Sequence, residues 1–185
     1  MNDQKRLING IISILNVNLI LTAKLMKLRS ISYTFIFLML IVGFSACNNQ
    51  HYFEQNKEIK AEKWSSNDRK TFQIDILDTN SLFNFYLNVR NTNEYPYANL
   101  YIFIESVFPD SAIARDTLEL QLANMEGKWL GSGYGRYKYN SFILRKGMRF
   151  VQTGSYSFTL EQGMRQDSLI GISDVGIKLS YDDDK

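Results

Sequence analysis

The residue whose surroundings indicate the most specific chemistry is the only cysteine, Cys47. Two small residues stand directly before it, and an apolar stretch from Tyr33 to Phe44 precedes them. A positive pair, Lys27 and Arg29, comes first. A charged, an apolar and a small-residue region in this order form a secretory signal peptide. A cysteine at its end is the site where bacterial lipoproteins receive acyl chains, so we predict a lipoprotein signal peptide over residues 26–46 and a covalent lipid, such as palmitate, on Cys47.

The alternative for this segment is a transmembrane anchor. The apolar run is shorter than the roughly 20 residues that a spanning helix needs, which favours the signal peptide. Several acyl chains on Cys47 would hold the protein stably at a membrane. Asn48, rather than an aspartate that retains lipoproteins in the inner membrane, follows the cysteine. We therefore expect an outer-membrane location in the cell envelope, and we interpret residues 1–25 as a mis-annotated N-terminal extension.

Side chains for acid–base or metal chemistry are few in this sequence. His51 is the only histidine, which excludes a Ser-His-Asp triad and a histidine-rich metal site. Carboxylates such as Asp75 and Asp78 are close in sequence, but a glycosidase needs two of them facing one another roughly 5–10 Å apart. The acidic tail, residues 182–185, lacks the glycine turn of a calcium loop. We expect no enzyme, no catalytic residue, no metal and no cofactor beyond the lipid.

Two segments combine features of an interaction surface. Trp129 stands beside Gly131 and Gly133, and a second polar turn contains Arg165. Tight backbone geometry beside an aromatic side chain suits a protein interface, and we predict these four residues to contribute to one. The alternative is that both segments are turns that stabilise the fold.

Aromatic residues suggest a different partner. Sugar-binding sandwiches use such rings as flat platforms, although several of them could equally fill the core. The candidates are Tyr95, Tyr97, Tyr101, Trp129, Tyr134, Tyr137 and Tyr139.

The charge of the exported part disfavours nucleic acid as a partner. The whole chain carries a formal net charge of +2, but five basic residues and one acidic residue precede Cys47, which leaves the part from Cys47 onward near −2. No basic run remains that could neutralise a row of phosphates. We therefore expect protein or neutral partners.

The elements that must position these residues are β-strands. Residues 47–63 are polar without alternation, and we predict a lipidated tether there. Over residues 64–181 apolar and polar residues alternate in six clear segments and in two weaker ones, 139–144 and 148–152, which a turn at 145–147 separates. The one helical turn that we expect lies near 162–166. Parallel strands would need crossover helices that this sequence does not supply. We predict an all-β fold, a single antiparallel β-sandwich of jelly-roll or immunoglobulin-like type.

The order of several motifs resembles the gliding-motility lipoprotein GldH family. After Cys47 and Trp64, residues 83–101 end in Asn-Glu-Tyr-Pro-Tyr-Ala-Asn-Leu-Tyr. Residues 116–133 end in Gly-Lys-Trp-Leu-Gly-Ser-Gly, and residues 154–176 end in Gly-Ile-Ser-Asp-Val-Gly. The resemblance implies an envelope lipoprotein of the machinery that moves surface adhesins and exports proteins, and it supplies no catalytic residue.

Three hypotheses follow from these observations. The first is a non-enzymatic, membrane-anchored lipoprotein of a gliding motility and secretion apparatus, with other envelope proteins as partners. The alternative is a surface carbohydrate-binding lipoprotein that uses the aromatic segments. The third, a small hydrolase with a carboxylate pair such as Asp75 and Asp78, has the least support.

Overall fold

Ten β-strands and one 3₁₀ turn make up residues 51–182, the part of the chain that this computed structural model describes. The strands are β1 (His51–Glu58), β2 (Lys63–Ser65), β3 (Lys70–Ile76), β4 (Phe83–Thr92), β5 (Asn99–Val107), β6 (Ile113–Gln121), β7 (Tyr137–Met148), β8 (Gly154–Gln162), β9 (Ser168–Ile170) and β10 (Ile172–Tyr181). The turn η1 (Lys60–Glu62) lies between β1 and β2. None of the helical segments described is long and apolar enough to cross a lipid bilayer.

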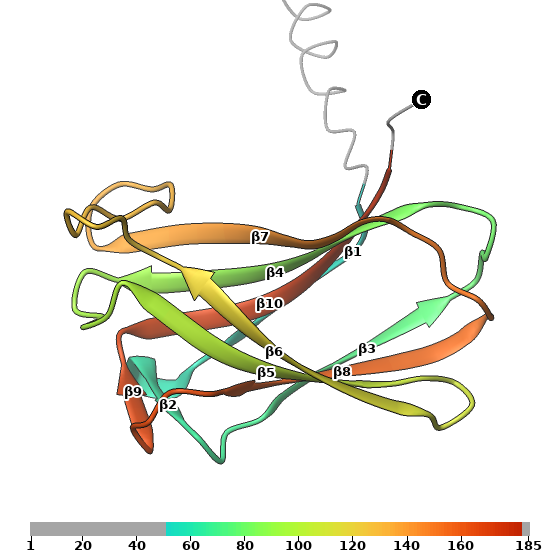
Figure 1. Ribbon diagram of the computed structural model, residues 1–185, viewed down its shortest axis with the longest axis horizontal. Helices are drawn as coiled ribbons and strands as arrows, with labels where there is room; N and C mark the ends of the chain where they lie inside the picture. The colour runs from blue at the N-terminus through green and yellow to red at the C-terminus, as the bar shows by residue number, and fades with distance from the viewer. Residues whose placement is uncertain (1–50, 183–185) are drawn as a thin grey trace, which may run out of the picture. The chain divides into compact units, whose positions relative to one another are not determined.

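Eight strands form two four-stranded antiparallel sheets, which lie in two layers (Figure 1). The first sheet has the order β1-β10-β4-β7 and the second β3-β8-β5-β6, while β2 and β9 form a separate pair. The pairings are nested: β5 with β6, β4 with β7, β3 with β8 and β1 with β10. This nested pairing arises when the chain forms one long hairpin, which then folds over into two layers. The prediction of an all-β antiparallel sandwich is confirmed, and of the two predicted types the chain forms the jelly roll.

The core lies between the two sheets and consists of the apolar residues that alternate along the strands. Phe72, Ile74 and Ile76 of β3 are buried, as are their counterparts on β4, β5, β8 and β10. Trp64 of β2 is also fully buried, and its indole Nε1 donates a hydrogen bond to the Asp68 carbonyl. Burial of each large apolar side chain contributes about 1.5–3 kcal/mol. Because these side chains face inward, the alternate residues of each strand face outward, where they can contact other molecules.

The predicted tether is wrong for residues 51–63. These residues form β1, η1 and the start of β2, and β1 pairs with β10 along its length. Gln55 and Lys57 pair with the buried Ile177 and Val175 of β10 and so occupy the positions on the core side of β1, where the sequence shows no apolar alternation. Lys57 nevertheless closes the side of the sandwich, since its ammonium lies 5.3 Å from the centre of the Phe72 ring and donates to the Thr71 carbonyl. The sandwich thus begins at residue 51, not 64, and residues 47–50 lie outside the described part.

Three smaller expectations also differ from the structure. β7 continues through the predicted turn at 145–147 and ends at Met148, so the predicted strand over 148–152 is a loop. Gly147 permits this because it adopts a φ of 62° at an irregularity in the β4–β7 register. The helical turn expected near 162–166 is an irregular loop. Of the acidic tail only Asp182 is described, and its carboxylate accepts a hydrogen bond from Asn84.

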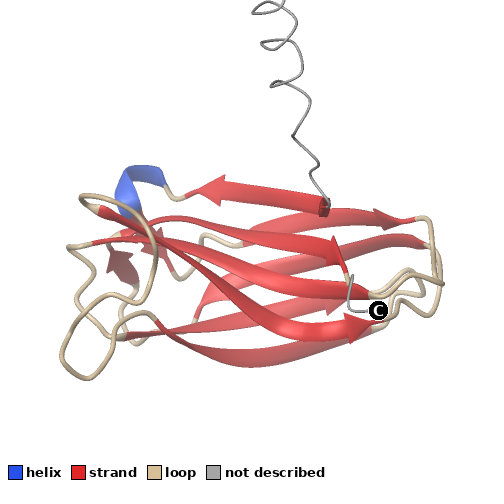
Figure 2. Ribbon diagram, turned by 90° about the horizontal axis from the view of Figure 1, so that it is seen from above, coloured by secondary structure: helices blue, strands red, loops and turns tan. Residues whose placement is uncertain are grey.

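The antiparallel strands place the loops in two groups at opposite ends of the sandwich (Figure 2). We call the end where β1 starts the proximal end; it contains the loops at 77–82, 108–112 and 149–153. We call the opposite end the distal end; it contains η1 and the loops at 122–136 and 163–167.

Candidate functional site

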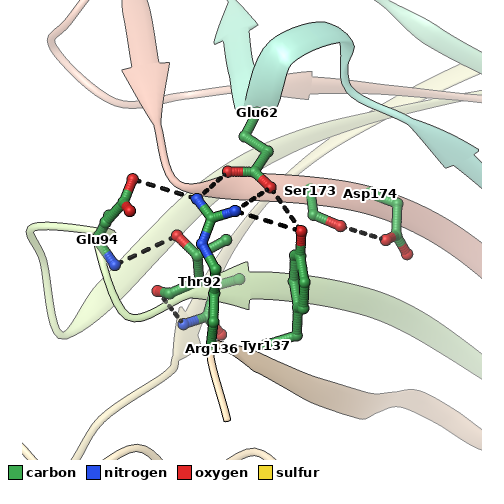
Figure 3. A network of polar contacts seen from close by, with 8 residues as sticks. Glu62, Thr92, Glu94, Arg136, Tyr137, Ser173 and Asp174 are labelled. Atoms are coloured by element: carbon green, nitrogen blue, oxygen red, sulfur yellow. Dashed lines mark hydrogen bonds and ion pairs between the residues drawn. The ribbon is translucent and has the colours of Figure 1, made fainter.

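A network of charged side chains at the distal end is centred on Arg136, directly before β7 (Figure 3). Its guanidinium contacts both oxygens of Glu62, with Nη2–Oε2 at 2.5 Å and Nη1–Oε1 at 3.1 Å. The same guanidinium lies 3.3 Å from a carboxylate oxygen of Glu94 and 5.3 Å from the centre of the Tyr137 ring. The Tyr137 hydroxyl donates to Glu62 at 2.9 Å. Two planar bonds to one carboxylate make this a geometrically specific ion pair.

The turn η1 holds Glu62 in place with a backbone that most residues avoid. Ala61 and Glu62 adopt φ values of 53° and 54°, the left-handed region in which a residue with a Cβ is strained. The Glu62 carbonyl accepts a hydrogen bond from the Gly171 N–H, and Ile59 donates to the Ser173 carbonyl. These bonds join η1 to β10. Strained residues persist where the surroundings fix them, and they concentrate at functional positions.

Arg136 is positioned by the glycine-rich end of the 122–136 loop. Gly135 has a φ of 68°, and the Arg136 carbonyl accepts a hydrogen bond from the Asn93 N–H. Desolvation lowers the pKa of Arg136, but the charges of Glu62 and Glu94 outweigh it and hold this pKa above its ordinary value. The guanidinium is therefore a permanent cation whose charge is compensated within the protein.

The network continues as a polar row on the outer face of the first sheet. Arg90 pairs with Asp174 at 3.5 Å, and Ser173 donates to the same carboxylate. Next to this row Asn88 is fully buried although it points away from the core, because the side chains of neighbouring strands cover it. Its partners are Glu54 and Asn56 of β1 and Ser141 of β7.

Gly176 makes the bridge between β1 and β4 possible. It lies on β10 between Asn56 and Asn88, and a Cβ at this position would lie 1.9 Å from the Asn56 Oδ1. Any other residue would displace the Asn56 side chain from Asn88. At this position the outer face therefore leaves no room for a side chain on β10.

This end of the molecule offers paired charges for recognition. Its depression of about 810 Å³ is lined by Glu58, Glu62, Arg90, Arg136, Tyr137 and Asp174. The carboxylates of Glu62 and Asp174 are both engaged with arginines. Within residues 51–182 no group of three or more metal-ligating side chains occurs. Paired charges of this kind give a fixed pattern of electrostatic potential, which a partner surface of complementary charge can bind.

The four predicted interface residues lie in two loops of the distal end. Trp129 is half-buried and packs on the core, with its ring 6.4 Å from that of Tyr95. A Cβ on Gly131 would lie 2.7 Å from the Asn140 side chain, and one on Gly133 would lie 2.8 Å from the Tyr137 carbonyl. These glycines let the loop pack against β7.

Arg165 is exposed in the loop between β8 and β9. Tyr97 links this loop to the aromatic residues beside Trp129, since its ring packs on Tyr95 and its hydroxyl accepts a hydrogen bond from Gln166. The structure therefore brings both predicted segments to one end of the molecule. Whether they bind a partner stays a prediction. Cys47, the predicted lipidation site, lies outside the described residues.

The aromatic platform expected for a sugar does not form from Tyr95, Tyr97 and Trp129. Tyr95 is only 3% exposed, and burial raises the pKa of its hydroxyl, which donates to the Asn99 carbonyl. Tyr97 and Trp129 pack against it. Tyr134 is fully exposed on the 122–136 loop.

Sequence reasoning missed Glu62, Arg136 and the buried Asn88. Glu62 was part of the expected tether, and its partner is 74 residues away. The only local signal in the sequence was the position of Arg136 directly after a glycine-rich segment. Spacing along the sequence cannot identify Glu62 and Arg136 as partners, because the order of strands in the sheets is what brings these two residues together.

Comparisons with known proteins give one family. A family model described as GldH lipoprotein matches residues 51–179. A "Gliding motility lipoprotein GldH homolog" of Christiangramia forsetii is 30% identical over 163 residues, 84% of this chain and 99% of that protein. The "Gliding motility lipoprotein GldH" of Flavobacterium johnsoniae is 27% identical over 155 residues, 80% and 96% of the two chains.

Solved structures give much weaker similarity. The Yersinia pseudotuberculosis-derived mitogen aligns with 72% of this chain and 89% of its own, at 6% identity and a TM-score of 0.34. Similarity at this level is no guide to function.

Proposed function

This chain belongs to the GldH lipoprotein family, and we propose that it is a non-enzymatic component of the gliding motility machinery and of an associated protein secretion apparatus. Family membership makes it a membrane-anchored lipoprotein of the cell envelope with a role in gliding. To this we add three proposals: anchoring through a lipid on Cys47, location at the outer membrane, and action by binding other envelope proteins.

The observation that carries the proposal is the extent of the family match. It covers residues 51–179, from the start of β1 to the end of β10, and therefore includes both loop ends and the outer face of the first sheet. The two named relatives are matched over nearly their full length. The family role is therefore assigned to the sandwich as a whole and not to one short motif within it.

The start of β1 and the proposed interface lie at opposite ends of this sandwich. β1 starts at His51, four positions after Cys47, and runs to Glu58 near the distal network. At about 3.3 Å per residue its eight residues separate the two ends by roughly 26 Å. The lipid proposed on Cys47 is therefore joined to the end opposite the distal loops, which leaves the loops of Trp129 and Arg165 accessible to partner proteins.

The anchoring step is tested by Cys47→Ala in the native host, with Asn49→Ala as the matched control. We expect the Cys47 variant to lose incorporation of an alkyne-labelled palmitate and to lose colony spreading, while folded protein is still detected. The Asn49 variant should keep both. Spreading at the wild-type level without lipid would contradict the anchoring proposal.

The non-enzymatic proposal is tested by the carboxylates that a hydrolase would need. Asp75 and Asp116 are exposed on strands of the second sheet. We expect Asp75→Asn and Asp116→Asn to leave colony spreading and the export of secreted proteins unchanged. Loss of either activity in a stably folded carboxylate variant would argue for catalysis.

A further inference from the structure

Apolar side chains project into solvent from the loops of the proximal end. Leu77, in the β3–β4 loop, is 81% exposed, and Val151, in the β7–β8 loop, is 88% exposed. Ile113, at the start of β6, is 67% exposed at the same end. Three apolar side chains at one end of the molecule have no cover within residues 51–182.

Arginines accompany these apolar residues at the end of β7. Arg145 and Arg149 line an apolar groove of about 520 Å³ together with Phe150 and Val151. The register turns Arg145 toward this groove: Tyr86 pairs with Ile143 but Phe85 pairs with Arg145, so Leu144 is an extra residue of a β-bulge. Bulges commonly redirect a side chain in this way.

These two arginines lack the ion pairs that most arginines of the described residues make. Arg69, Arg90, Arg115 and Arg136 each lie within 3.5 Å of a carboxylate. No ion pair joins Arg145 or Arg149 to any residue from 51 to 182.

The acidic side chains of the proximal loops are engaged elsewhere. Asp78 accepts hydrogen bonds from the Asn80 N–H and the Ser81 hydroxyl, and Asp110 accepts one from the Ala112 N–H. Asp182 is bonded to Asn84. Asp116 also lines the groove, so the groove itself holds two cations and one carboxylate. Arg145 and Arg149 are thus available to an external anion.

The covalent connection restricts what can lie against this end. Four residue steps separate Cys47 from His51, and a fully extended chain spans at most about 3.6 Å per residue. A lipid on Cys47 therefore keeps the start of β1 within roughly 14 Å of its anchoring point. β1 is the edge strand of the first sheet, and the proximal loop beside its start is 77–82, where the Leu77 N–H donates to the Tyr52 hydroxyl.

We propose that the proximal end of the sandwich rests on the lipid surface, with Leu77 and Val151 inserted between headgroups and with Arg145 and Arg149 against lipid phosphates. Apolar tips combined with cations are what an interfacial membrane contact requires. This inference depends on the proposed lipid anchor, and it adds an orientation. The distal end, with its paired charges, is then directed away from the membrane.

The test uses the cysteine that the chain itself provides. Residues 47–185 contain the whole sandwich and one thiol, so Cys47 can be coupled to a maleimide lipid in vesicles of phosphatidylethanolamine and phosphatidylglycerol. Val151→Trp and Tyr134→Trp place an added indole at the proximal and distal ends, both at exposed positions. Lipids brominated on their acyl chains quench tryptophan that enters the bilayer.

We expect the added fluorescence of Val151→Trp to be quenched roughly two-fold or more, in line with insertion to about 5–10 Å, and that of Tyr134→Trp to stay unquenched. Val151→Trp combined with Arg145→Glu and Arg149→Glu should lose most of this quenching. A circular dichroism spectrum confirms that each variant is folded. Equal quenching at both positions, or none at Val151→Trp, would overturn the proposal.

Two further results would also overturn it. Protection of the indole in Val151→Trp without quenching, together with dimers in light scattering, would identify a second copy of the chain as the occupant. Quenching that is unaffected by Arg145→Glu and Arg149→Glu would remove the role of the arginines. Because the anchor in this experiment is chemical, failure here leaves the Cys47→Ala test of the proposed function independent.

Discussion

Arg136 and Glu62 show how one ion pair can fix an irregular segment. A solvent-exposed pair contributes little by itself, typically about 0–1 kcal/mol. Here the carboxylate sits on a backbone turn with two left-handed residues, Ala61 and Glu62, which cost roughly 1–3 kcal/mol each. The bidentate contact with Arg136 and the backbone bonds to Ser173 and Gly171 offset that cost. The exact position of Glu62 therefore depends on a strained neighbour.

The strain at Ala61 can be measured with a glycine. Ala61→Gly removes the Cβ that is unfavourable at a φ of 53°, a gain of roughly 1–2 kcal/mol, while glycine adds about 0.5–1 kcal/mol of unfolded-state entropy. We expect a net increase of about 0.5–1 kcal/mol in the free energy of unfolding, measured with urea. The matched control is Ala114→Gly in β6, which should lower it. A decrease for both variants would show that Ala61 is not strained.

The edge strand β1 shows how a polar segment becomes part of a sandwich. Its backbone pairs with β10, and its side chains make contacts on both faces. Inward, Lys57 covers Phe72; outward, Glu54 and Asn56 cover Asn88. Polar groups can take these places because each has a partner, and an unpaired buried amide would cost about 1–3 kcal/mol.

Gly176 is the position at which this arrangement is most sensitive. We expect Gly176→Ala to lower the free energy of unfolding by about 1–3 kcal/mol, since its Cβ would overlap the Asn56 side chain. The double variant with Asn56→Ala should recover part of that loss, because the clash with the side chain is relieved while that with the Gln55 carbonyl, 2.5 Å away, persists. Urea titration of the four proteins of this cycle measures the coupling. A loss that Asn56→Ala leaves unchanged would place the clash in the backbone alone.

At the scale of the whole molecule, nested strand pairing separates two ends with different surfaces. The proximal end contains the start of β1, apolar loop tips and two arginines without ion pairs among the described residues. The distal end contains the Arg136 network and the loops of Trp129 and Arg165. With the lipid that we propose on Cys47, this polarity matters, because the short connection to β1 would bring the proximal end toward the membrane.

The short connection predicts a dependence on length. Insertion of 20 Gly/Ser residues between Asn49 and Gln50 adds a flexible coil of about 25 Å. We expect colony spreading to fall, because a longer linker lowers the effective concentration of the sandwich near its partner proteins in the same envelope. The same linker added after Lys185 is the control and should leave spreading intact. Undiminished spreading with the N-terminal insertion would show that close attachment is not required.

Alternation of apolar and polar residues along the chain is sufficient to predict most of the fold. It located β3, β4, β5, β6, β8 and β10 and the side chains that fill the core, because an apolar residue at every second position has only one face to bury. It failed at β1, where Gln55 and Lys57 occupy inward positions, and at the three-residue strands β2 and β9, which are too short to show a period. The predicted end at 145–147 failed because a bulge continues β7 there.

The sequence by itself determined an alternating all-β chain and the motif order of one lipoprotein family, and it predicted an export signal that ends at the single cysteine. These are local or additive properties that can be counted along a chain. Only the tertiary structure decided which residues meet. Glu62 and Arg136 are 74 residues apart, and Asn88 is buried by strands that precede and follow it. Such contacts depend on the order of strands in the sheets, which long-range packing sets and no single segment encodes.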